Sequence, residues 1–157
     1  MNMEKAHLDQ KVNTSKSTIM YEEAKDWIST LEFHNDSLIG LKNIIDRYLD
    51  EMVLHENLDE IRECVMRLQE VRYTCRSLLK KVKSHQSLLI KQIDKKQEIN
   101  LVLENSHQAL NARLRVLKTK FHEIKNEVFF ITEYAMEIDK EEKLTVELEK
   151  IKASRYN

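Results

Sequence analysis

A heptad pattern of apolar residues runs through almost all of this chain, and nothing in the sequence is suited to interrupt it. The 157 residues contain no proline and a single glycine, Gly40. Turns and bulges depend on these two residue types, and proline breaks helices. The sequence therefore predicts an all-α fold of long helices joined by few connections.

The first heptad stripe begins at Met20 and steps alternately by four and three residues. It contains Met20, Ala24, Trp27, Leu31, His34, Leu38, Leu41, Ile45, Tyr48 and Met52. Neighbouring apolar residues such as Ile28 and Ile44 widen the stripe, which indicates a bundle with two partner helices instead of a two-stranded seam. Residues 1–17 show no sustained periodicity and are expected to form a flexible N-terminus.

A second helix is expected after a short connection. The first helix should end near Leu54, and Asn57 can cap the next helix, with Glu60 three residues on. Its predicted stripe contains Leu58, Ile61, Val65, Leu68, Cys75, Leu79, Val82, Leu89 and Ile93. Both helices span about 37 residues, or roughly 55 Å, and these equal lengths predict an antiparallel hairpin.

One heptad position of the second helix is irregular. Arg72 and Gln86 interrupt it. Three neighbours can compensate, namely Val71, Leu78 and His85.

The third helix is the most regular of the three. One heptad position holds Leu103, Leu110, Leu117, Ile124, Ile131 and Ile138, and the other holds His107, Leu114, Phe121, Val128 and Ala135. The preceding connection is expected near residues 94–100, with Asn100 or Asn105 as the N-cap. Residues 18–138 are thus predicted to form three long antiparallel helices in a left-handed, coiled-coil-like bundle.

Residues 139–157 are expected to form a helical C-terminal extension. Leu144, Leu148 and Ile151 make a second, shifted apolar stripe there. The segment either continues the third helix past the bundle or forms a separate short helix, which Asp139 can cap. Four helices, by dimerisation or by folding this segment back, are the close alternative.

Two resemblances accompany this pattern. The segment YEEAKDWISTLEF, residues 21–33, resembles the first helix of a spectrin repeat, a three-helix unit with a tryptophan on its core stripe. The whole chain is similar in style to small uncharacterised helical proteins of Bacteroidetes, which have an aromatic-rich first helix, a charged middle helix and a long final helix. The resemblances imply an all-helical fold, and they carry over no activity, cofactor or functional residue.

The sequence offers little for catalysis. Cys-x-x-Cys and His-Glu-x-x-His motifs are absent, and a single glycine cannot form a phosphate-binding loop. Cys64 and Cys75 lie about 16 Å apart along one predicted helix, beyond disulfide reach, so both are expected to be reduced thiols. We therefore expect a non-enzymatic, cytoplasmic protein with no cofactor, no small-molecule substrate and, since its apolar runs are short, no membrane span.

Four residues remain as metal-binding candidates: His34, His85, His107 and Glu104. Pairing the helices through their turns places His85 level with His107, and His34 about two turns further along. Hydrogen-bonded packing in the core is the competing interpretation, which the heptad spacing favours. His34 is then expected either to find one hydrogen-bond partner or to share a layer with the other two histidines.

Charge and exposed apolar residues give the remaining functional predictions. Basic side chains gather in two segments that the hairpin places side by side: Lys80, Lys81, Lys83, Lys91, Arg113, Arg115, Lys118 and Lys120. They are expected to set helix register through flanking ion pairs, and nucleic-acid or other polyanion binding is the alternative. A protein interface, with self-association or another protein, is predicted at Phe129, Phe130, Tyr134, Leu144, Leu148 and Ile151.

Overall fold

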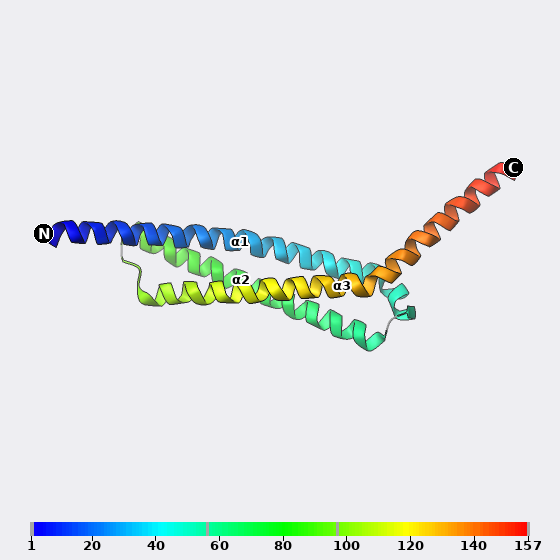
Figure 1. Ribbon diagram of the computed structural model, residues 1–157, viewed down its shortest axis with the longest axis horizontal. Coiled ribbons are helices and arrows are strands. Elements are labelled where there is room, and N and C mark those ends of the chain that lie inside the picture. Colours follow the sequence, from blue (N-terminus) through cyan, green and yellow to red (C-terminus); the bar gives the residue numbers. More distant parts are fainter. Residues whose placement is uncertain (1, 56, 97, 157) are drawn as a thin grey trace.

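Three helices account for nearly all of the protein. The computed structural model describes residues 2–55, 57–96 and 98–156, with the side chains of residues 2, 7, 9–15 and 156 left out. The helices are α1 (Asn2–His55), α2 (Leu58–Asp94) and α3 (Leu101–Tyr156), and no strand occurs in these ranges. Figure 1 shows α2 running antiparallel to both α1 and α3 in one elongated bundle. The predicted all-α helical bundle is confirmed.

The two connections are built from helix caps. The Asn57 side chain accepts a hydrogen bond from the backbone N–H of Asp59 at 2.9 Å and so caps α2, as predicted. Asn100, and not Asn105, caps α3, because its side chain accepts from the Leu103 N–H at 2.7 Å. Between these helices, Lys96 adopts a φ of 52°, a left-handed conformation that often ends a helix.

The predicted stripes of α1 and α3 form the core. Every residue of the α1 stripe from Met20 to Met52 is buried except Trp27, which is partly exposed. In α3, Leu103 to Ala135 are buried at the heptad positions, and only Leu114 is partly exposed. The periodicity of these two helices therefore identified their buried faces correctly.

In α2, one of the two buried heptad positions is shifted by one residue from the predicted one. Its core consists of Ile61, Cys64, Leu68, Val71, Cys75, Leu78, Val82, His85 and Leu89. The expected Val65 and Leu79 are only partly buried, and Leu58 is exposed. The shift follows from the interruptions: the predicted face would bury Arg72 and Gln86, whereas the neighbouring position offers apolar side chains and a histidine.

The start of α1 also differs from the prediction. A flexible segment was expected over residues 1–17, yet residues 2–17 are helical. Without glycine or proline, extending an existing helix costs little per residue. The last part of this segment also contacts α3, since Lys16 pairs with Glu104 and Ser17 is buried.

The C-terminal segment continues α3 without a break. The helix runs to Tyr156, and Asp139 pairs with Lys143 at 3.1 Å within the helix instead of capping a new one. Figure 1 shows this last part leaving the bundle at an angle, with no other helix alongside it. The extension therefore passes beyond the bundle and does not fold back.

The single glycine provides a test of the helical assignment. Gly40 lies within α1, and a methyl group added there meets no atom within 4 Å. We expect Gly40→Ala to raise the free energy of unfolding by about 0.8 kcal/mol, because alanine loses less backbone entropy in a helix. Urea unfolding followed by circular dichroism measures this, and a destabilised variant would contradict a regular helix at this position.

Candidate functional site

A polar layer lies inside the bundle near the α2–α3 connection. The Nε2 atom of His85 lies 2.8 Å from Nδ1 of His107, and Nε2 of His107 lies 3.0 Å from a carboxylate oxygen of Glu23. Trp27 stacks on His107 with ring centroids 4.4 Å apart. One residue from each of α2 and α3, and two from α1, therefore meet here. His85 and His107 therefore lie level with each other, as predicted.

The hydrogen bonds of this layer are consistent with neutral rings. The Glu23 carboxylate accepts a hydrogen bond from the Nε2–H of His107, which leaves Nδ1 of His107 as the acceptor for the Nε2–H of His85. Burial, and then the neighbouring His107, lowers the pKa of His85 to about 4. An uncharged His85 therefore satisfies its partner without placing a charge in the core.

His34 does not join this layer. Its ring packs against Phe121 with centroids 4.3 Å apart, and its buried Nδ1 finds no hydrogen-bond partner within the described part of the chain. Burial, followed by His122 and Lys118, lowers the pKa of His34. His34 therefore does not share a layer with His85 and His107, and at its Nδ1 an aromatic ring takes the place of the expected polar partner.

Of the four metal-binding candidates, the structure brings together only His85 and His107. Glu104 is paired with Lys16. Among the residues that the structure describes, no group of three or more histidine, cysteine, aspartate or glutamate side chains is placed to hold a metal ion. The geometry instead supports hydrogen-bonded packing of His85 and His107.

The two cysteines are buried and unreactive. Both are free thiols inside the core. Burial, and then Glu127, raises the pKa of Cys64 to about 12, and burial also raises that of Cys75. The Cys75 thiol donates to the carbonyl oxygen of Leu31 at 3.4 Å. Neither is suited to act as a nucleophile, because the thiolate is disfavoured.

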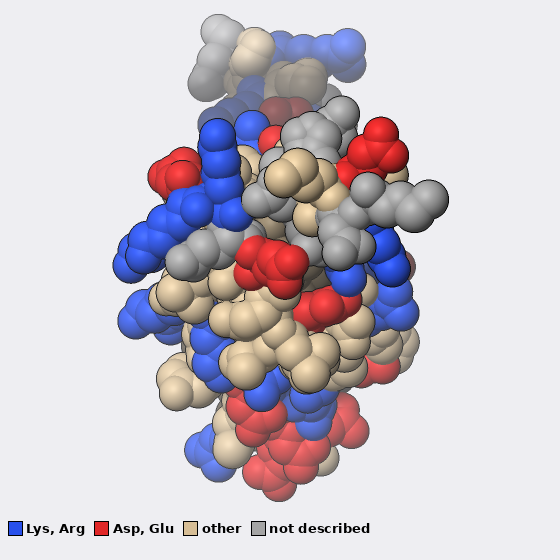
Figure 2. Space-filling view, turned by 90° about the vertical axis from the view of Figure 1, so that its left-hand side faces the viewer, with Lys and Arg blue, Asp and Glu red and all other residues tan. Residues whose placement is uncertain are grey.

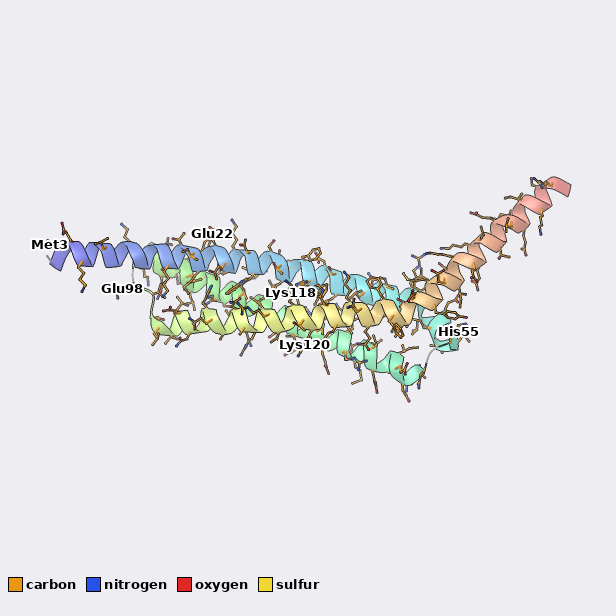
Figure 3. All side chains as sticks on the ribbon, in the orientation of Figure 1. Met3, Glu22, His55, Glu98, Lys118 and Lys120 are labelled. Atoms are coloured by element: carbon orange, nitrogen blue, oxygen red, sulfur yellow. The ribbon has the colours of Figure 1, made fainter. Side chains whose placement is uncertain are left out.

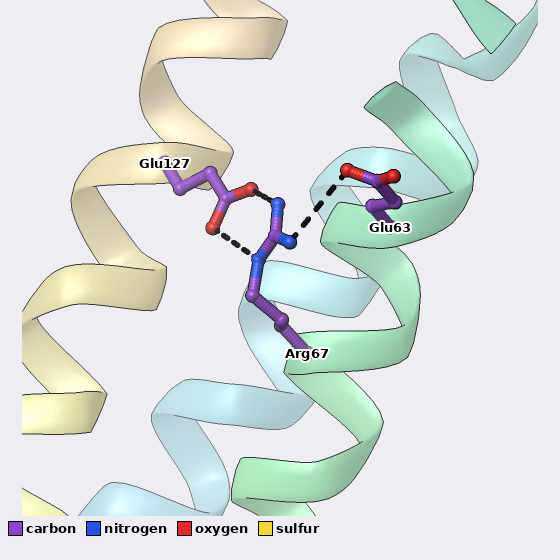
Figure 4. Close-up of polar contacts among 3 residues, drawn as sticks. All are labelled: Glu63, Arg67 and Glu127. Carbon is purple, nitrogen blue, oxygen red and sulfur yellow. Dashed lines mark hydrogen bonds and ion pairs between the residues drawn. The ribbon is translucent and has the colours of Figure 1, made fainter. Parts of the chain in front are cut away.

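Ion pairs link the helices, although few of them involve the predicted basic residues. Lys83 lies 3.8 Å from Glu32 and so joins α2 to α1 as expected. The closest α2–α3 pair was not predicted: Figure 4 shows Arg67 binding both carboxylate oxygens of Glu127, with Glu63 at 3.9 Å. Such two-pronged contacts fix geometry better than single ion pairs.

The other basic residues divide between two sides of α3. Figure 3 places Lys118 on the side of α1 and Lys120 on the opposite side. Lys118 lies near His34, whereas Lys120 lines a groove of about 340 Å³ between α2 and α3. Arg115 is exposed. The predicted basic face is therefore not one continuous surface.

A second groove between α2 and α3, of about 700 Å³, gathers several of the predicted basic residues. Five basic side chains line it, and no acid does so among the described residues: Lys80, Lys81, Lys91, Lys95 and Arg113. Leu88, Val102 and Leu110 supply apolar parts of its wall. Figure 2, which views this end of the molecule, shows basic side chains on both flanks with acids between them. We call this site the basic groove.

All the predicted interface residues are exposed. The exposed fractions reach 76% for Phe130 and 59% for Leu144. Starting at Phe130, steps of four and three residues along α3 describe one helix face: Phe130, Tyr134, Glu137, Glu141, Leu144, Leu148, Ile151 and Arg155. We call this set the outer α3 face. Phe129 is exposed on a different side of the helix, and Tyr134 makes an edge contact with His55 at 4.9 Å.

No protein-family model, curated protein or solved structure matches the chain. The resemblances to a spectrin repeat and to helical proteins of Bacteroidetes therefore stay predictions. None of the helices, over the residues described, is both long enough and apolar enough to cross a membrane.

The histidine layer predicts a dependence of stability on pH. The unfolded chain protonates His85 near its ordinary pKa of 6.5, whereas the folded protein keeps it neutral down to about pH 4. The unfolded state therefore binds more protons between these values, and stability falls as pH decreases. We expect the free energy of unfolding to drop by about 2 kcal/mol from this group between pH 6.5 and 4.5.

Urea unfolding across this pH range, compared with a His85→Gln variant, isolates that contribution. The variant should lose clearly less stability on acidification than the wild type. His122→Gln is the matched control, because its ring is exposed. Equal pH dependence in wild type and His85→Gln would contradict a neutral, buried His85.

Proposed function

We propose that the protein is a non-enzymatic interaction module that binds another polypeptide through the outer α3 face. The observation that carries this proposal is the position of the face: its second half lies on a helix that has left the bundle. Leu144, Leu148 and Ile151 are each at least half exposed there. Surfaces of this kind mark protein contacts, because a contiguous apolar stripe gains free energy by leaving water.

The bundle supports this role by holding the helix. The extension alone would be a marginal helix in water, since starting a helix is unfavourable. The packed part of α3 provides that start, and the extension grows from it. The buried core, from Leu103 to Ala135, therefore presents the extension in helical form to a partner.

A photo-crosslinking amino acid placed on either side of the extension tests this function. Benzoylphenylalanine at Leu148 should form crosslinks to polypeptide in living cells, and the same group at Val146 should not. The two positions are matched, with exposed fractions of 50% and 49%, yet they point to opposite sides of the helix. Gel electrophoresis of the tagged chain detects the products. Equal crosslinking from both positions, or none from Leu148, would contradict the proposal.

A second candidate function is polyanion binding in the basic groove. The specific observation in its favour is the convergence of five basic side chains with no acidic neighbour among the described lining residues. Phosphate groups bound by such side chains release counterions, so the affinity would fall with salt.

Fluorescence anisotropy with a labelled single-stranded DNA at about 50 mM salt tests the basic groove. Lys81 and Arg113 line the basic groove and also the neighbouring groove that contains Lys120. Lys81→Glu/Arg113→Glu should weaken binding about tenfold or more, because it reverses two charges at the site. Arg115→Glu/Lys118→Glu makes the same change of net charge elsewhere and should have a smaller effect. An absence of binding by the wild type at this salt would end this candidate.

A further inference from the structure

The charged residues of the outer α3 face are separated by sign along the helix. Its acids, Glu137 and Glu141, come first, and its basic residue Arg155 comes last, with Lys152 beside it. Leu144, Leu148 and Ile151 lie between the two ends. All of these side chains are exposed. The face is therefore acidic where it leaves the bundle, apolar in its middle and basic near its end.

This order fits a second copy of the same helix in one direction only. Two parallel copies would place acids beside acids and bases beside bases, which is unfavourable. Two antiparallel copies place the acidic end of each beside the basic end of the other. A twofold symmetric pair satisfies both ends at once.

We propose that the partner of the outer α3 face is a second copy of this chain, and that the two extensions pack antiparallel as a symmetric dimer. This inference rests on the proposed function, since it names the partner of the same surface. The face contains both signs of charge, so it matches its own reverse better than a surface of one sign, such as the basic groove.

The heptad positions define one register for the pair. When Leu144 lies level with Leu148 of the other copy, Glu141 lies level with Ile151 and Glu137 with Arg155. A shift by one heptad would place Glu141 against Leu144 and Glu137 against Leu148, which would bury both acids among leucines. The first register places the leucines in the centre and the Glu137–Arg155 pairs at the ends. Only Glu141 then lies level with an apolar side chain, Ile151, and Lys152 follows Ile151 in the sequence.

The contacts that the charged residues of the outer α3 face already make do not prevent this pairing. Glu137 has only an exposed contact with Lys140, at 3.8 Å, and such surface pairs contribute little. Phe130 and Tyr134 lie outside the paired region in this register. They are on the part of α3 that belongs to the bundle, where Tyr134 contacts His55.

Sedimentation equilibrium of the purified full chain at roughly 50 μM tests the association, since micromolar dissociation constants are expected of a small interface. The mass should approach that of a dimer. Glu137→Lys/Glu141→Lys should weaken the dimer at least tenfold, because each substitution counts twice in a symmetric pair. Adding Lys152→Glu and Arg155→Glu to the same chain should restore it. A monomeric wild type, or a failure of this rescue, would overturn the proposal.

A matched control separates the face from net charge. Glu142→Lys/Glu149→Lys changes the net charge by the same amount, but these exposed residues lie outside the outer α3 face. This variant should dimerise as the wild type does. Helical content and the unfolding transition of each variant, measured by circular dichroism, establish that the bundle is folded. Equal weakening in the control would overturn the assignment to this face.

Introduced cysteines determine the direction of pairing. A mixture of tagged Glu137→Cys and untagged Arg155→Cys should form a mixed disulfide, because these positions are level only in the antiparallel pair. Cys64 and Cys75 are fully buried and can stay in place. Val146→Cys, on the opposite side of the helix, should not crosslink. A Glu137→Cys homodisulfide as the main product would indicate parallel helices and overturn the proposal.

The two levels of the proposal fail in different ways. Crosslinks from Leu148 but not Val146 in cells, together with a monomeric purified chain, would refute the second copy as partner and leave the interaction function intact. An absence of crosslinks from Leu148 would refute the interaction function, and a monomeric purified chain would then refute the dimer as well.

Discussion

Burial of a continuous heptad stripe on each helix is the constraint on which the rest of this structure depends. The core of a three-helix bundle is a narrow stack of layers. Each layer must therefore be filled by side chains from all three helices at the same height. Leu38, Leu68 and Leu117, one from each helix, have almost none of their surface exposed. A polar residue in such a layer needs neighbours that accommodate its ring: His107 contacts Glu23, His85 and Trp27, and His34 packs against Phe121. The core thereby fixes which side chains are left for the surface.

The sequence predicted the buried faces of α1 and α3 well because only one apolar stripe on each helix is wide enough to be buried. In α2 two adjacent heptad positions compete, and the periodicity alone does not separate them. The structure selects the position that contains Cys64, Val71, Leu78 and His85. The cost of burying Arg72 and Gln86 explains the choice, and this cost can be judged from the sequence only by comparing whole positions instead of counting apolar residues.

For the candidate site, the sequence predicted the heights of residues along the bundle axis, but not which side chains contact one another at a given height. Heptad spacing and the turns set relative heights, which is why the meeting of His85 and His107 was foreseen. The neighbour of His34 and the pairing of Arg67 with Glu127 depend instead on how the helices are rotated about their axes. Charged residues make up 34% of the chain, so many such pairs are compatible with one sequence, and packing decides among them.

The continuity of α3 joins the core to the outer face. Between Phe130 and Ile138 the helix is apolar on two sides at once: Ile131 and Ala135 face the core, while Phe130 and Tyr134 face outward. Both series follow the same heptad frame, offset by one residue, which is about 100° around the helix. Any rotation of α3 in the bundle would turn the extension with it. The packing of Ile131 and Ala135 therefore sets the direction in which Leu144, Leu148 and Ile151 are presented, so the stability of the bundle and the orientation of its outer face are governed by the same residues.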